Sequence, residues 1–198
     1  MNRRTFLKNI AVVGIGALIS PFSIPEASAA WNDNESYRLQ LNIVNSYLSF
    51  KSLENRTRTD AIIIHHIGNT NADVSAARIH EWHLANGWAG IGYHFVIRKN
   101  GMIEQGRPMD AIGAHCYGEN SHTVGVNLVG NFMESQPEAA QMTSGAGLIA
   151  ALCRVYKLEP SAKTVFGHRD FNATACPGDN LYARLPELIE QAKNIYYA

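Results

Sequence analysis

The sequence predicts a single α/β domain built on a central mixed β-sheet flanked by helices. The chain has 198 residues, enough for one domain with a substantial core, and 46% of them are hydrophobic, which excludes a disordered chain. Short apolar runs typical of strands alternate with segments of helical spacing. Asn100-Gly101 is a strong signal for a tight hairpin. A sheet that combines such a hairpin with strands separated by helices is mixed.

The first 29 residues have the order of a secretory leader. Arg3 and Arg4 precede an apolar run over residues 10–19, and an Ala-Ser-Ala segment ending at Ala29 follows as a cleavage site. A permanent membrane helix needs ~20 apolar residues, so we expect no stable span in the mature chain. The paired arginines followed by Phe-Leu-Lys are typical of twin-arginine leaders, and an ordinary secretory leader is the alternative. We expect cleavage after Ala29 and export to the periplasm or the extracellular space.

Charge gives no reason to expect a polyanionic partner. The whole chain carries 17 basic and 17 acidic residues and has no formal net charge. The leader removes three basic residues and one acidic residue, which leaves the mature chain with a net charge of about −2. We therefore expect no nucleic-acid partner.

The segment after the leader is predicted to be helical. Apolar side chains recur every three to four residues over residues 32–52. Residues 30–59 would then form a helical extension ahead of the main domain, which we place at residues 60–198.

The main domain opens with a continuous apolar run at residues 61–65, which is typical of a buried central strand. Asp73 is placed to cap a helix that ends at Asn86-Gly87. The remaining segments follow in chain order: hairpin strands at 92–98 and 102–104, a long loop at 106–120, a strand at 124–129, a helix at 137–157, a short strand at 163–166 and a final helix at 180–196.

Histidine and cysteine near the C-terminus indicate a zinc site. His168 and Cys176 stand in one loop rich in Gly and Pro, and imidazole and thiolate are ligands that zinc prefers. A third ligand is available from His65 or His66, which end the first strand. Side chains alternate across a strand, so only one of these two can face the metal, and the spacing does not choose between them. A core histidine bonded to the backbone is the alternative interpretation.

Other histidines and cysteines allow two readings each. His80 and His83 share one face of a predicted helix and could be half of a metal site, but we favour an ordinary helix surface because no acidic or thiol partner is placed to complete it. Cys116 and Cys153 could form a disulfide in an exported protein, or Cys153 could be a small buried apolar residue.

Five short motifs follow one another in an order that resembles a known family. They are Ile63-Ile64-His65-His66, Gly87-Trp88 with Gly90-Ile91-Gly92-Tyr93-His94-Phe95, Gly113-Ala114-His115, Val124-Gly125-Val126, and Gly167-His168-Arg169-Asp170 with Cys176-Pro177-Gly178-Asp179. Together they resemble the zinc N-acetylmuramoyl-L-alanine amidases related to phage T7 lysozyme and the peptidoglycan recognition proteins, over about residues 60 to 190.

The resemblance implies a substrate groove over one zinc ion (Zn2+) and assigns roles to single residues. The metal ligands would be His65, His168 and Cys176, which chooses His65 over His66. Tyr93 would face the reacting water, and Thr174 stands where some relatives carry a lysine. The residues implied to line the groove are His66, His94, His115 and Asn120. Three protein ligands leave one tetrahedral position for water, whose pKa zinc lowers to roughly 7.

The resemblance also implies the reaction and its alternatives. The substrate would be peptidoglycan or muropeptides, cut at the amide between N-acetylmuramic acid and L-alanine. A module that binds peptidoglycan without cutting it is the first alternative, although all three ligand positions are filled here. A Cys-His peptidase with Cys176 as nucleophile is the second, and Pro177 directly after the cysteine argues against a helix dipole that would activate it.

Overall fold

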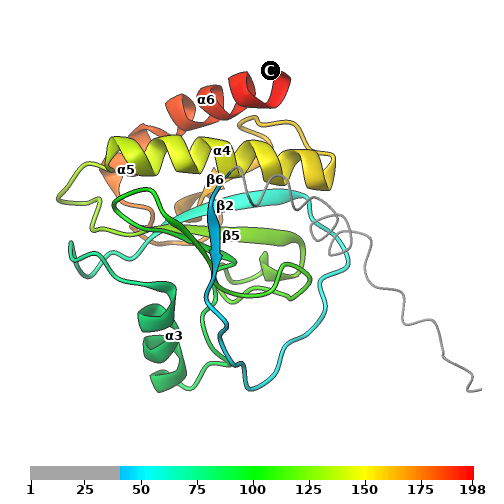
Figure 1. Ribbon diagram of the computed structural model, residues 1–198, viewed down its shortest axis with the longest axis vertical. Helices are drawn as coiled ribbons and strands as arrows, with labels where there is room; N and C mark the ends of the chain where they lie inside the picture. Colours follow the sequence, from blue (N-terminus) through cyan, green and yellow to red (C-terminus); the bar gives the residue numbers. More distant parts are fainter. Residues whose placement is uncertain (1–40) are drawn as a thin grey trace, which may run out of the picture.

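The structure, a computed structural model, describes residues 41–198 as one sheet covered by helices (Figure 1). The predicted leader at 1–29 lies outside the described residues, as does the start of the predicted extension. The strands are β1 (Ile43–Asn45), β2 (Ala61–His66), β3 (Phe95–Ile97), β4 (Ile103–Gln105), β5 (Thr123–Leu128) and β6 (Val165–Gly167). The helices are α3 (Ala76–Ala85), α4 (Ala139–Tyr156), α5 (Asp179–Ala183) and α6 (Leu185–Tyr197), with short 3₁₀ turns η1 (Asn120–His122) and η2 (His168–Asp170).

The six strands form one mixed sheet in the order β1-β4-β3-β5-β2-β6, which confirms the predicted fold class. β2 runs parallel to both β5 and β6, and among the strands of residues 41–198 only β3 and β4 pair antiparallel. The turn of that hairpin places Gly101 at a φ of 85°, a conformation that glycine adopts without strain. Every residue of β2 is buried, as expected for a parallel strand covered on both faces.

The two faces of the sheet carry cores of unequal size. The larger core lies under α4 and α6, and Ile62 and Ile64 of β2 point into it. The smaller core lies under α3, where Ile79 packs against Val96 of β3. Because side chains alternate along β2, His65 points to the face with the smaller core.

The predicted helical extension is wrong over its described part. Residues 41–59 contain no helix, and β1 in this segment pairs in parallel with β4 at the edge of the sheet. Leu41 contacts the larger core, whereas Leu48 and Phe50 contact the smaller one. The segment therefore runs past the sheet edge from one face to the other, and this demand overrides a weak helical spacing.

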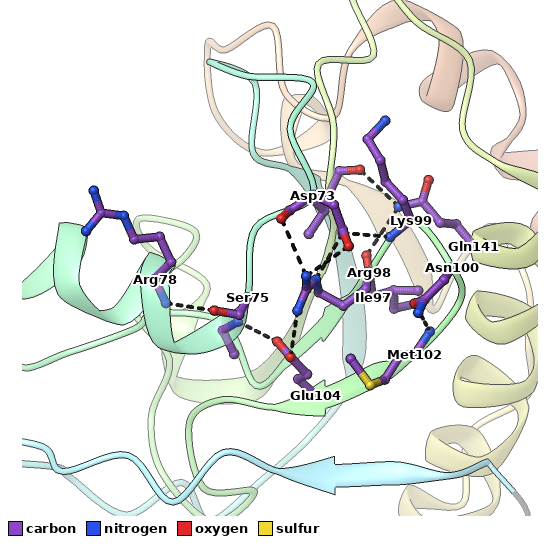
Figure 2. A network of polar contacts seen from close by, with 12 residues as sticks. Asp73, Ser75, Arg78, Ile97, Arg98, Lys99, Asn100, Met102, Glu104 and Gln141 are labelled. Atoms are coloured by element: carbon purple, nitrogen blue, oxygen red, sulfur yellow. Dashed lines mark hydrogen bonds and ion pairs between the residues drawn. The ribbon is translucent and has the colours of Figure 1, made fainter.

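A polar network ties the hairpin to the start of α3 (Figure 2). The cap of α3 is Ser75, whose hydroxyl accepts the N–H of Arg78 at 3.2 Å, and not Asp73 as predicted. Asp73 instead forms a two-pronged ion pair with Arg98, with N···O distances of 2.9 and 2.8 Å. Arg98 also bonds Glu104, whose other oxygen accepts the N–H of the first helical residue at 2.5 Å. Asp73 is thus engaged by the hairpin and is not free to cap.

The C-terminal helix differs from the prediction in one respect. The predicted helix over 180–196 is two helices, α5 and α6, which meet at Arg184. Pro186 stands in the first turn of α6, where a missing N–H costs nothing. Among the described residues, no helix has the length and apolar character needed to cross a membrane.

Candidate metal centre

Three potential ligand atoms meet at one end of the central strands. β2 and β6 are adjacent and parallel, with Ile64 opposite Gly167, so His65 and His168 follow the same end of the sheet side by side. Cys176 returns to this point after η2, and its Sγ lies 3.6 Å from His65 Nδ1. One ligand atom from each of these three residues lies within 4.8 Å of the others. The set of two imidazoles and one thiol is one that binds zinc, so the residues fit the predicted metal.

Each of the three side chains also contacts a hydrogen-bonding group outside the set of predicted ligands. His65 Nε2 lies 3.0 Å from His115 Nδ1, and His168 Nε2 lies 3.1 Å from the Asn172 side-chain oxygen. The Cys176 sulfur accepts the backbone N–H of His66 at 3.4 Å. Such outer contacts orient metal ligands before the metal arrives.

The electrostatics of the site favour neutral groups in the metal-free protein. Burial lowers the pKa of His65 well below its usual value and also lowers the pKa of His168, so both imidazoles can offer a lone pair. Burial raises the pKa of the Cys176 thiol to about 12. A thiol that keeps its proton at neutral pH is a poor nucleophile, which weakens the Cys-His peptidase alternative.

Tyr93 and Thr174, the two predicted catalytic residues, both lie beside the ligands. The Tyr93 ring centroid is 5.1 Å from that of His65. Burial raises the pKa of the Tyr93 hydroxyl above its usual value, and a negative charge on Cys176, once that thiol loses its proton, raises the pKa further. The Thr174 hydroxyl accepts the backbone N–H of Cys176 at 3.2 Å, which leaves its own proton available for donation.

Two of the four predicted groove residues are bonded to the backbone instead. His94 has no exposed surface, its Nδ1 accepts the N–H of Gly125 at 3.1 Å, and its Nε2 lies 3.0 Å from the Ala111 carbonyl oxygen. It therefore does not line a groove. His66 is buried on the opposite face from His65, and its Nδ1 accepts the N–H of Phe132 at 3.2 Å. Burial lowers the pKa of His66 to about 4.

The other two groove candidates organise the loop around the site. The Asn120 side-chain oxygen accepts the backbone N–H groups of His115 and Cys116, at 2.8 and 3.0 Å. The His115 ring is buried against His65, and burial lowers its pKa to about 3. His115 is therefore a partner of the predicted ligand His65.

His80 and His83 are not the ordinary helix surface that the sequence predicted. Their Nδ1 atoms accept the backbone N–H groups of Ile91 and Gly92, at 3.1 and 3.0 Å. These two bonds fix the main chain immediately before Tyr93. The shared helix face was predicted correctly, but its role is to hold this segment.

The cysteines outside the site are free thiols, so the possible disulfide is not formed. Cys153 is fully buried in the larger core, which confirms the alternative reading. Cys116 donates from its sulfur to the Asn172 side-chain oxygen at 3.4 Å. Asn172 was missed by sequence reasoning, although its position four residues after His168 in the same loop is a usable signal.

A cavity of about 340 Å³ is lined by parts of the segment before β2, of the segment after α3 and of the loop that leads to His115. Trp88, Arg107 and Ala114 are among its lining residues, and Ala114 directly precedes His115. Arg107 is buried and donates to the carbonyl oxygens of Ile91 and Ile112, at 2.9 and 2.7 Å. Its Nη2 has no hydrogen-bond partner within residues 41–198. No motif or spacing in the sequence marks this arginine as part of a site.

Comparison with known proteins identifies the family. The family model described as N-acetylmuramoyl-L-alanine amidase matches residues 55–179. The endolysin of Klebsiella phage KP32 is 37% identical over 132 residues, which covers 64% of this chain and 85% of the endolysin.

Solved structures of related proteins share the fold. The N-acetylmuramoyl-L-alanine amidase LysC from Clostridium intestinale superimposes with a TM-score of 0.68 at 33% identity, covering 75% of this chain and 97% of LysC. A Drosophila PGRP-LB variant in complex with tracheal cytotoxin gives a TM-score of 0.66 at 28% identity, covering 73% and 92%. The family match spans more than half of the chain and includes all three predicted ligands, His65, His168 and Cys176. The chain belongs to the N-acetylmuramoyl-L-alanine amidase family.

Proposed function

We propose that this protein is an exported zinc amidase that hydrolyses the amide bond between N-acetylmuramic acid and L-alanine in peptidoglycan. The observation that carries the proposal is the meeting of His65, His168 and Cys176 in a family whose members include endolysins and amidases. Zinc held by these residues would polarise the amide carbonyl and make an attacking water acidic enough to react at neutral pH.

The neighbouring side chains suit the charge that develops during amide hydrolysis. The raised pKa of Tyr93 keeps its hydroxyl protonated, so it can donate a hydrogen bond to the oxygen that becomes negative in the transition state. Thr174 accepts a bond from the backbone of Cys176 and can donate its own proton in the same way. Both groups would act without changing their protonation state.

The cavity lined by the loop that leads to His115 supports a substrate with a peptide portion. Its volume of about 340 Å³ suits a few residues rather than a whole glycan chain. Arg107 is one of its lining residues, and its positive charge would favour an anionic group such as a carboxylate of the stem peptide.

The proposal is tested by digestion of intact sacculi and of soluble muropeptides, with mass spectrometry of the products. The expected products are stem peptides with a free L-alanine amine and glycan with an intact lactyl group. A chelator should abolish the reaction and added zinc should restore it, and Cys176→Ser should be inactive. Binding without any cleavage would instead favour a recognition module. Cleavage that survives the chelator but is lost to iodoacetamide would favour a Cys-His peptidase.

We further propose that residues 1–29 are an export leader and that the mature chain starts at Ala30. The arrangement of charges, apolar run and small residues supports this. Residues 30–59 would then precede the amidase domain at 60–198, with the described part extended rather than helical. N-terminal sequencing of the protein recovered outside the cytoplasm tests the cleavage site. Replacing both Arg3 and Arg4 with lysine tests the twin-arginine route, since an ordinary secretory leader tolerates that change.

A further inference from the structure

We propose that His115 is a positioning residue that holds His65 in the one tautomer able to bind zinc. The inference rests on the zinc site proposed above. His65 Nε2 lies 3.0 Å from His115 Nδ1, and His65 Nδ1 faces the Cys176 sulfur at 3.6 Å. A neutral imidazole carries one ring proton, so only one of its nitrogens can bind a metal. The partner of the other nitrogen decides which one is free.

His65, His115 and Thr123 form a series of hydrogen bonds, and the bond that Thr123 makes to Glu119 determines the direction of all the others. The Thr123 hydroxyl donates its proton to the Glu119 carbonyl oxygen at 2.8 Å. The same hydroxyl oxygen lies 3.5 Å from His115 Nε2 and can only accept there, because its proton is already used. His115 therefore carries its proton on Nε2 and presents a bare Nδ1 to His65. This bare nitrogen accepts from His65 Nε2, which leaves His65 Nδ1 free beside Cys176.

A doubly protonated His115 would donate from Nδ1 to His65 Nε2 and so reverse the hydrogen bond between the two rings. The surroundings of His115 disfavour that charged state. The ring is buried, and its described neighbours include the rings of His65 and His94, with centroids 5.0 and 5.8 Å away. None of the hydrogen bonds described for the ring reaches a carboxylate. A buried cation without an anionic partner is strongly disfavoured.

The packing leaves the His115 ring no freedom to move away. A Cβ atom at Gly113 or Gly125 would lie 2.4 or 2.6 Å from the His115 ring. Gly125 stands inside β5, where a glycine weakens a strand and often marks a close approach of other atoms. The backbone N–H of His115 is held by the Asn120 side chain at 2.8 Å. Two glycines and one asparagine thus fix the ring against His65.

Two substitutions at His115 separate this role from simple packing. His115→Phe keeps a planar ring but removes the acceptor, and we expect zinc affinity to fall about 10–100-fold, as for other outer partners of metal ligands. His115→Asn places an acceptor oxygen near the position of Nδ1, and we expect it to recover most of that affinity. Zinc affinity is measured by competition with a chelator. Circular dichroism of the metal-free variants confirms that they are folded.

The tautomer itself is read from the ¹⁵N NMR signals of His65 in the metal-free wild-type protein, assigned by their loss in His65→Gln. We expect the proton on Nε2. A proton on Nδ1, or equal zinc affinities for His115→Phe and the wild type, would overturn the inference. If His115→Phe does not fold, the ¹⁵N NMR measurement of the His65 tautomer in the wild-type protein tests the inference by itself. A wild-type protein that binds no zinc would refute the proposed function, and its His65 tautomer would still test the role of His115.

Discussion

The affinity of this site for zinc should depend on pH through a single group, the Cys176 thiol. Burial raises the pKa of that thiol to about 12, whereas it lowers the pKa values of His65 and His168 below their usual range. Near neutral pH the imidazoles are already neutral, so the proton on sulfur is the one that must leave when zinc binds. Well below its pKa, the thiolate fraction rises tenfold for each pH unit. The apparent Kd should therefore fall about tenfold between pH 6 and pH 7, or about 1.4 kcal/mol.

The quantity to measure is the slope of log Kd for zinc against pH, whose magnitude equals the number of protons released on binding. Chelator competition, corrected for proton binding by the chelator at each pH, gives this slope. The matched control is Cys176→Ser, whose hydroxyl can contact zinc without giving up a proton. Its binding should be weaker and nearly independent of pH over the same interval. A wild-type slope near zero would mean that the thiolate already exists in the metal-free protein. A slope of two or three protons would mean that the histidines are charged, and either result would refute the reasoning.

Three further predictions concern the hydroxyl at the site, the backbone near it and acid stability. Tyr93→Phe should keep its zinc affinity and lose about 10²–10⁴-fold in kcat on muropeptides, and an unchanged kcat would exclude a catalytic role. Gly92→Ala would place a Cβ 1.9 Å from a main-chain carbonyl oxygen, so it should cost more than about 3 kcal/mol in urea unfolding. Gly87→Ala, at a φ of 84° in open space, should cost only about 1 kcal/mol, and equal losses would contradict the steric argument. Burial lowers the pKa of His94 well below 6.5 and that of His83 to about 4, so the unfolded state alone binds protons between those values. The metal-free protein should therefore lose up to about 1.4 kcal/mol per pH unit for each such histidine as pH falls below 6.5, and a constant urea midpoint from pH 7 to 4.5 would contradict this.

The sheet could be predicted because its signals are local. The apolar run in β2 and the Asn100-Gly101 turn each report a backbone conformation that neighbouring residues already determine. The segment before β2 was misread for the opposite reason. Leu41 and Phe50 contact different cores, so the path of this segment depends on tertiary packing and not on the spacing of its own apolar residues.

In the candidate site, too, some features follow from local sequence and others depend on tertiary packing. Side-chain alternation predicted that only one of His65 and His66 could face a metal, but the choice required the family resemblance. In the structure the reason is physical, since His66 faces the larger core and is bonded to Phe132. The contact of His115 with His65 joins residues 50 positions apart, so no local spacing announces it. The contact of Asn172 with His168 joins residues four positions apart in one loop, and that short spacing was the available signal.

The loop that carries Cys176 explains why the site can be formed before a metal binds. Arg169 donates its backbone N–H to the Cys176 carbonyl oxygen at 3.0 Å, and its side chain pairs with Asp179 at 2.7 Å. The backbone of Gly178 bonds Ala175 at 2.8 Å, which closes the turn after the cysteine. These bonds fix the cysteine relative to the strand ends that place the two histidines. The ligand geometry therefore follows from sheet register and loop hydrogen bonds, and the cores that stabilise the fold contain none of the three ligands. In a small zinc finger the metal supplies the folding energy itself, whereas in this protein the fold alone brings the three predicted ligands together.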